Sequence, residues 1–240
     1  MDKEYSDHIV EAKRRAICCI VVLAAFVMIC CTKVTWIFDN VLKLCRDAGF
    51  EVISISPGDS VISVIALIFT MAVLLTAPFF VFQIMEFILP AVRRKDVLHI
   101  RLAAFMAMGL FYVGLAFSFF VMLPFFFEFM AEYGDKLHVS RSFSVSDYLS
   151  FICTFSVCLG LAFETPLIVI VLWCIRVIDS FTIKRIRGVL YLLIFVVAAL
   201  ITPPDAISQL MVALPMMFLF EAGNVCGKKL VSLKKRKVME

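Results

Sequence analysis

Two acidic residues interrupt basic stretches of this sequence, and together they could bind guanidinium groups. Glu11 lies in HIVEAKRR, residues 8–15, and Asp96 ends EFILPAVRRKD, residues 86–96. A carboxylate accepts charge-assisted hydrogen bonds from a guanidinium, two at once when the geometry matches. Each segment alone is typical of the solvated flank of a membrane helix. Together they predict a pair of carboxylates that could hold cationic ligands in an otherwise basic rim.

Helical spacing adds a local contact to the first of these segments. His8, Glu11 and Arg15 would share one face of a helix, because residues three and four apart are neighbours on its surface. A Glu four residues before an Arg ordinarily supports the helix by a few tenths of a kcal/mol. The pair is therefore predicted to form, whether or not it has a further role.

Glu164 is the third acidic residue with chemical interest, because it stands alone in the apolar run 148–175 within the sequence FETP. An unpaired charge at such a depth costs at least ~2.5 kcal/mol. The carboxyl group should therefore face a cavity or a partner, or be protonated. Pro166 should kink the helix and free the carbonyl of Ala162 beside it. A neutral Glu satisfied by a neighbouring helix is the alternative to a functional role.

The apolar runs lack the combinations of catalytic residues that intramembrane enzymes use. The three histidines, His8, His99 and His138, fall outside them, so neither a Ser/His pair nor an HExxH metal site can form at membrane depth. Every Asp lies at an edge or in a loop, which excludes an aspartyl dyad. We therefore expect no enzyme, no metal and no cofactor.

The elements that position these residues follow from composition. The chain has 240 residues, of which 63% are hydrophobic and 18% charged, and its mean hydropathy is +1.03. A soluble domain is nearer to about half apolar and a quarter charged. The composition excludes a water-soluble globule, and the apolar side chains must be solvated by lipid.

Six uncharged or nearly uncharged runs predict six transmembrane helices, because about 20 apolar residues cross a bilayer and a lipid-exposed backbone must satisfy its own hydrogen bonds. The sequence thus predicts an all-α integral membrane protein, a single membrane domain over 1–240. We expect a cytoplasmic N-terminus at 1–15 and a basic cytoplasmic tail at 222–240. The predicted spans are approximately 16–38, 60–89, 102–127, 148–175, 188–201 and 203–221.

The orientation follows from the basic residues. With six spans, 18 of the 23 Lys and Arg residues fall on the side that holds both termini, and 5 fall on the other side. The positive-inside rule places both termini in the cytoplasm. The outer segments, 33–59 and 128–147, are too short for independent cores, and most of the nine cysteines lie in spans, so no disulfide framework is expected.

Spans 5 and 6 are unusual because they are short and meet at a tight turn. Thr202 could cap the sixth helix, with Pro203 at its first position, Pro204 after it and Asp205 completing a capping box. A functional role for Asp205 remains equally open. Span 6 also carries Ser208, Gln209 and Glu221, which could join it to an internal helix or to the helix of another protein.

These motifs, in this order, resemble the TatC family, a subunit of the twin-arginine protein translocase. HIVEAKRR is similar to the family's H-[LI]-x-E-L-R-x-R, SPGDS to S-P-x-E, and AP…QIMEFILPAV to A-P…Q-x-W-x-F-x-x-P-A-L. FETP, TPPDAISQ and LPMMFLFEAG resemble F-E-x-P, T-P-P-D-x-x-S-Q and P-x-x-x-L-F-E-x-G. The resemblance extends from about residue 7 to 223.

The resemblance implies a receptor for signal peptides with paired arginines, in the cytoplasmic membrane of a bacterium. It implies a concave, cup-like bundle that works with TatA or TatB type single-span partners to move folded proteins, driven by the proton gradient. The implied signal-peptide site contains Glu11, Asp96, Phe87, Arg94, His8 and Lys13. Glu164 would lie inside the concave face, Gln209 and Ser208 would contact a partner helix, and Pro90, Pro166, Thr202, Pro203, Pro204, Asp205 and Glu221 would be structural.

Three departures from the family pattern affect the implied site. Ala12 and Lys13 replace the family's Leu-Arg, and Asp96 replaces a Glu, which is one methylene longer. Glu86, beside Phe87, is a carboxylate that the pattern does not require. We hypothesise that Glu86 partly compensates for the shorter Asp96.

Two rival functions remain open at this stage. A small-molecule secondary transporter would also explain Glu164, but such transporters typically show internal repeats and several polar groups at the membrane midplane. A purely structural scaffold would explain the spans and would be insensitive to changes at Glu11 or Asp96.

Overall fold

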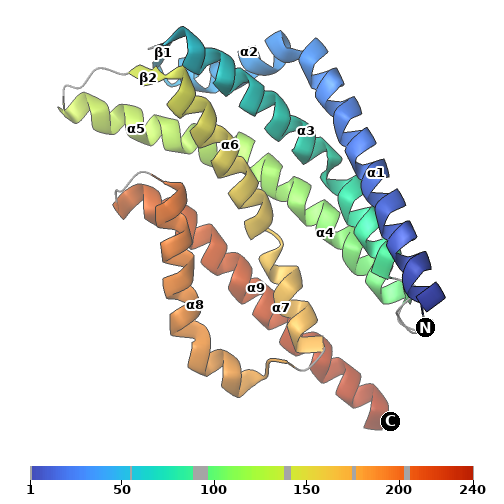
Figure 1. The fold of residues 1–240 in the computed structure, drawn as a ribbon. Coiled ribbons are helices and arrows are strands. Elements are labelled where there is room, and N and C mark those ends of the chain that lie inside the picture. Colours follow the sequence, from blue (N-terminus) through green and yellow to red (C-terminus); the bar gives the residue numbers. More distant parts are fainter. Residues whose placement is uncertain are drawn as a thin grey trace. The chain divides into compact units, whose positions relative to one another are not determined.

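The computed structural model describes residues 2–54, 56–88, 97–137, 142–174, 177–202 and 206–239, and nearly all of them are helical (Figure 1). The helices of the first half are α1 (Asp2–Thr32), α2 (Val34–Asp47), α3 (Pro57–Ile88), α4 (Val97–Phe117), the π-helical turn η2 (Ser118–Met122) and α5 (Leu123–Leu137). Those of the second half are α6 (Val145–Ala162), α7 (Thr165–Cys174), α8 (Ser180–Ile201) and α9 (Ala206–Met239). Two three-residue strands, β1 (Glu51–Ile53) and β2 (Ser142–Ser144), pair in parallel.

Five helical segments of the described chain are long and apolar enough to cross a membrane: Val10–Thr32, Gly58–Phe87, Ile100–Lys136, Val145–Cys174 and Gln209–Ser232. They correspond to predicted spans 1 to 4 and 6. The remaining span corresponds to α8, whose first half carries Lys184, Arg185 and Arg187 and whose apolar part is short, as predicted. The fold is that of an all-α integral membrane protein, and its helices are compatible with six spans.

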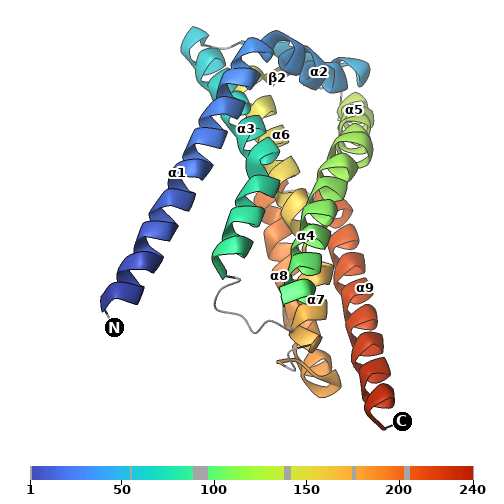
Figure 2. The same cartoon turned by 90° about the vertical axis from the view of Figure 1, so that its right-hand side faces the viewer.

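The first predicted span, 16–38, is divided between two helices. Its helix was expected to continue to residue 38, but α1 ends at Thr32 and a turn at Lys33 starts α2. The Lys33 amide donates to the Cys30 carbonyl at 3.2 Å, which tightens the last turn. Figure 2 shows α2 turning away from the axis of α1. Trp36 therefore belongs to a separate amphipathic helix that is buried on one face, at Val41, Leu42 and Cys45.

The two outer segments pack on one another, although each is too small to form a core alone. β1 pairs with β2 in the register Glu51–Ser142, Val52–Phe143 and Ile53–Ser144. The ring of Phe50 lies 6.3 Å from that of Phe127 and 4.9 Å from that of Phe143, between ring centroids. The buried Tyr148 hydroxyl donates to the carbonyl of Val41. This shared core also buries Cys45 completely, which raises the pKa of its thiol to about 11.

The fourth span is broken as predicted. α6 ends at Ala162 and α7 begins at Thr165, so Glu164 lies at a non-helical junction. The Glu164 amide donates to Leu161 at 3.1 Å, a tightened turn, and the Glu164 carbonyl accepts from Ile168 at 3.0 Å. Pro166 has no N–H to donate to the carbonyl of Ala162, which explains why the helix is interrupted here.

The helices that contain predicted spans 5 and 6 extend beyond the predicted bounds of those spans. α8 begins at Ser180 rather than near 188, because the Asp179 carboxylate caps it by accepting from the amides of Phe181 and Thr182. These bonds, chiefly that from Thr182, hold the pKa of Asp179 below its usual value. α9 does not end at 221 but continues through most of the predicted tail, to Met239. Lys, Arg, Leu and Val make up much of this extension, which contains no proline.

The predicted capping box at Thr202 stays a prediction, because Pro203 and Asp205 fall in a gap between described residues. Thr202 ends α8: its amide and its hydroxyl both bond the carbonyl of Ala198, at 3.0 Å and 2.9 Å. The described part of α9 begins at Ala206. Pro203, Pro204 and Asp205 lie outside the described residues. Thr202 therefore closes the last turn of α8.

The chain divides into two compact units, residues 1–108 with 122–153 and residues 109–121 with 154–240. In the second unit, α9 packs against both α7 and α8. Its buried core contains Val169, Trp173, Ile178, Ile183 and Phe220. Gly223 and Gly227 of α9 lie directly against Pro166 and Trp173 of α7. These contacts explain why the helix stays ordered beyond its apolar part.

Candidate functional site

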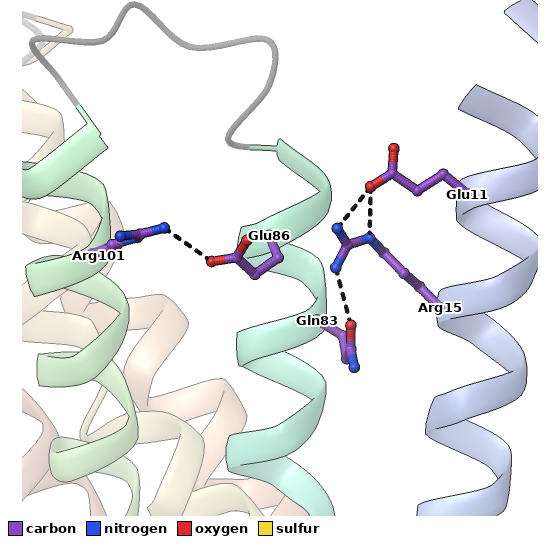
Figure 3. Close-up of polar contacts among 5 residues, drawn as sticks. All are labelled: Glu11, Arg15, Gln83, Glu86 and Arg101. Atoms are coloured by element: carbon purple, nitrogen blue, oxygen red, sulfur yellow. Dashed lines mark hydrogen bonds and ion pairs between the residues drawn. The ribbon is translucent and has the colours of Figure 1, made fainter. Parts of the chain in front are cut away.

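The first predicted carboxylate, Glu11, is held by a network between α1 and α3. Arg15 donates from Nη2 and Nε to Oε1 of Glu11, at 2.7 Å and 3.1 Å, which confirms the predicted pair (Figure 3). Arg15 also donates from Nη1 to Oε1 of Gln83 on α3, at 3.1 Å. One guanidinium therefore joins the start of α1 to the end of α3.

The network leaves half of the Glu11 carboxylate open. Both bonds from Arg15 end on Oε1, and Figure 3 shows Oε2 pointing away from Arg15. Among the described residues, no other side chain bonds Oε2. The side chain of Glu11 is 37% exposed and that of Arg15 is 25% exposed, so the Glu11 side chain is partly accessible to solvent and ligands. A carboxylate fixed on one side can accept a second guanidinium on the other.

Glu86 forms a second ion pair one helical turn from Gln83. Nη2 of Arg101 on α4 lies 3.4 Å from Oε1 of Glu86, and the Glu86 side chain is 27% exposed (Figure 3). The long distance indicates a weak bond, which a better donor could replace. Phe87 is exposed beside it. This end of α3 therefore offers a carboxylate and an aromatic ring to a ligand.

Several predicted members of the site cannot be placed. Asp96, Arg94 and Pro90 lie outside the described residues. His8 lies on α1, but its side chain is outside the described part, and Lys13 is exposed on the same helix. The structure thus places Glu11 on α1 opposite the end of α3, where Glu86 points toward α4 (Figure 3) and Phe87 is exposed. It leaves the position of the second predicted carboxylate, Asp96, as a prediction.

Glu164 lies half-buried at the α6–α7 junction. In the part of the chain that the structure describes, no Lys or Arg pairs with it. The junction is rigid on one side, because Gly223 of α9 approaches the backbone of Pro166, two residues away. An acidic group on a fixed break in a membrane helix can exchange a proton or accept a hydrogen bond from a bound segment.

The polar residues of α9 mainly join it to α8. Glu221 accepts from Nη2 of Arg187 at 2.7 Å and from the hydroxyl of Tyr191 at 2.6 Å. Gln209 donates from Nε2 to the carbonyl of Phe195 at 2.9 Å. These bonds favour the internal alternative, in which the polar groups stabilise a helix pair of this chain. The side chain of Ser208 lies outside the described part.

Sequence reasoning missed three residues of the network. Gln83 and Arg101 belong to α3 and α4, and Arg15 was expected only to support its own helix. Gln83 could have been found as the only amide in the apolar run 60–85. The described residues contain no group of three or more metal-ligating side chains.

Comparisons with known proteins identify the family. The family model "Sec-independent protein translocase protein (TatC)" matches residues 7–215. A TatC protein of Helicobacter pylori is 31% identical over 176 residues, which cover 73% of this chain and 69% of that protein. The TatC protein of Escherichia coli K12 is 28% identical over 223 residues, covering 90% and 84%.

A solved structure agrees in fold. The crystal structure of the twin-arginine translocase receptor TatC in DDM superposes with a TM-score of 0.80 at 25% identity, covering 92% of this chain and 99% of that one. These relatives are translocase components rather than enzymes, and the alternative of a small-molecule transporter is not favoured. The bacterial relatives and the apolar helices make this chain a multi-pass protein of the bacterial inner membrane. The chain therefore belongs to the TatC family and is a component of the Sec-independent, twin-arginine protein translocase.

Proposed function

We propose that this chain is the membrane receptor of the translocase. It binds twin-arginine signal peptides on the cytoplasmic side and, with TatA or TatB type partners, moves folded proteins across the membrane, driven by the proton gradient. The observation that carries the proposal is the open Oε2 of Glu11, on a carboxylate whose other oxygen is fixed by Arg15. A solved relative is described as the twin-arginine translocase receptor, which supports the same reading.

The proposed recognition is electrostatic and geometric. One arginine of the signal peptide would bond Oε2 of Glu11, and the second would reach Asp96, with Glu86 contributing because Asp96 is short. Phe87 and Arg94 would shape the site, and His8 and Lys13 would border it. Each charge-assisted bond contributes about 1.5 to 3 kcal/mol. Lysine is a point charge without the planar fork of arginine, so it cannot replace the pair.

Co-purification with a precursor tests this function. A precursor whose signal peptide carries paired arginines should co-purify with the detergent-extracted chain, and the same precursor with two lysines should bind about tenfold more weakly or less. The reason is the loss of at least one charge-assisted bond, since 1.4 kcal/mol corresponds to a factor of ten. Equal recovery of the two precursors would contradict the proposal.

Partner binding is proposed for the α8–α9 pair. Gln209 and Ser208 lie near the start of α9 and would contact the single helix of a TatA or TatB type protein. Gln209 uses one donor on the carbonyl of Phe195, which fixes the amide for contacts with a second helix. The exposed side chains of Leu192, Val196 and Leu200 on α8 add an apolar surface of the kind that a membrane helix can cover.

Glu164 should be needed for transport but not for assembly. Glu164→Ala should insert normally and still capture the precursor, while transport falls by about tenfold or more, the factor for one charge-assisted bond. Transport of a reporter into the periplasm measures the loss. Glu132→Ala, which removes an exposed carboxylate on α5, is the matched control and should transport normally. Wild-type transport by Glu164→Ala would exclude a role for this residue.

A further inference from the structure

We propose that Gln83 and Arg15 are positioning residues for the arginine-binding carboxylate, Glu11. The inference rests on the proposed function, since it assigns the residues that prepare its site. A single guanidinium links the three residues, because Arg15 donates both to Gln83 and to Glu11. In this role Gln83 orients Arg15, and Arg15 fixes Glu11. Neither Gln83 nor Arg15 needs to touch the signal peptide.

The arrangement of the bonds distinguishes this role from an ordinary surface ion pair. An unconstrained Arg–carboxylate pair commonly forms two parallel bonds, one to each oxygen. Here Nε and Nη2 converge on Oε1, at 3.1 Å and 2.7 Å, and Oε2 is left for another donor. The third contact, from Nη1 to Gln83 at 3.1 Å, sets the plane of the guanidinium from a different helix.

The anchor on α3 also sets the position of α1. Gln83 and Arg15 are both half-buried, and α1 packs along α3 (Figure 3). The bond between Arg15 and Gln83 adds a polar contact to the packing of these two helices. With the anchor in place, the Glu11 carboxylate is held opposite the end of α3 (Figure 3).

A rival role for Arg15 is that of a competitor. Arg15 could occupy the carboxylate in place of a peptide arginine and so weaken binding. A competitor would cover both oxygens, or the oxygen that faces outward, whereas Arg15 bonds only Oε1. The two roles predict opposite effects when the guanidinium is removed and the positive charge is kept.

Two variants that conserve charge isolate the positioning effect. Arg15→Lys keeps the charge but cannot bond Glu11 and Gln83 in the same fixed plane. Gln83→Leu removes the anchor at nearly constant size. Each should weaken binding of a twin-arginine precursor by roughly 3- to 10-fold, because the Glu11 side chain must then be ordered on binding. The double variant should bind the precursor with about the same affinity as whichever single variant binds it less tightly, because both changes release the same guanidinium.

Binding is measured as the dissociation constant of a fluorescent precursor on the full chain in detergent, with the twin-arginine precursor and its twin-lysine form. In the variants the preference for arginine over lysine should fall, since a lysine ammonium depends less on the orientation of the carboxylate. A general folding defect would weaken the binding of both precursors by the same factor. Arg14→Lys, the same substitution at an exposed neighbour, is the matched control and should bind like the wild type.

The outcomes separate the two proposals. If wild-type protein does not prefer the twin-arginine precursor, the proposed function fails and the positioning role fails with it. If the wild type shows the preference but Arg15→Lys and Gln83→Leu keep it unchanged, only the positioning role is overturned. Tighter binding of the precursor by Arg15→Lys would overturn the positioning role and would show that Arg15 competes with the peptide arginine for Glu11. Additive losses in the double variant would also contradict a shared guanidinium.

Discussion

Glu11→Gln should weaken capture of a twin-arginine precursor by at least about 30-fold, with little change in stability. Removing one partner of a hydrogen-bonded charge pair that is buried in the complex costs about 2 to 5 kcal/mol, and 2 kcal/mol already corresponds to about 30-fold. Gln keeps the size and the helix propensity of Glu but loses the negative charge. Arg15 then remains as an uncompensated cation, which repels the incoming arginine. The loss of an exposed helix pair alone changes stability by only a few tenths of a kcal/mol.

The matched control lies elsewhere in the chain. Glu132 of α5 pairs with Lys136 at 2.8 Å in the same spacing of four residues, and both side chains are well exposed. Glu132→Gln removes an equivalent ion pair without affecting the proposed site, and it should bind the precursor like the wild type. A precursor titration with detergent-extracted protein compares the two variants. Binding by Glu11→Gln within about threefold of the wild type would show that this carboxylate does not hold the arginine pair.

The transmembrane helices were predictable because their signal is local. An apolar run long enough to cross a bilayer can be read from any segment of about 20 residues. The helix ends were less predictable, because they depend on individual contacts. Asp179 starts α8 well before its apolar part, and Lys33 separates α1 from α2. Hydropathy does not report such caps and turns.

The packing of the outer segments was not predictable from the sequence. β1 and β2 are three residues each and are far apart in the chain, so neither carries a strand signal of its own. Their core depends on Phe50, Phe127 and Tyr148, which come from three separate segments. Two segments that are individually too small for a core form one when the helices bring them together.

The site was partly predictable, because contacts within one helix follow from residue spacing and contacts between helices do not. Glu11 and Arg15 pair within one helix, so their spacing of four residues predicted the contact. Gln83 and Arg101 act between helices, and a single sequence does not show which helices are adjacent. The break at Glu164 was predictable from Pro166. The glycine contact that fixes this break involves α9 and was not predictable.

Gly223→Ala should destabilise the protein, although alanine is the better helix former. The added Cβ would lie 2.6 Å from Cα of Pro166 and 2.8 Å from its carbonyl oxygen, closer than real contacts allow. Both atoms belong to the backbone of α7, so no side-chain rotation can relieve the clash. Overpacking of this kind costs about 1 to 3 kcal/mol, which should lower the unfolding midpoint in detergent by roughly 2 °C or more.

Gly188→Ala provides the matched control with the opposite sign. Gly188 lies in α8, and its added Cβ would meet nothing within 4 Å. Alanine is favoured over glycine in a helix by up to about 1 kcal/mol, so this variant should be as stable as the wild type or slightly more stable. The stability of Gly227→Ala should lie between those of Gly223→Ala and Gly188→Ala. Its added Cβ would approach the ring of Trp173 at 2.7 Å, and a side chain can shift to relieve the contact.

The glycine series also tests how Glu164 is positioned. Gly223 contacts Pro166, two residues after Glu164, so a displaced α7 would move the junction that carries the carboxyl group. Gly223→Ala protein that remains folded should therefore transport less than Gly227→Ala protein of similar abundance, while both capture the precursor normally. Thermal unfolding that is the same for Gly223→Ala and Gly188→Ala would show that α7 and α9 do not approach as closely as this packing requires.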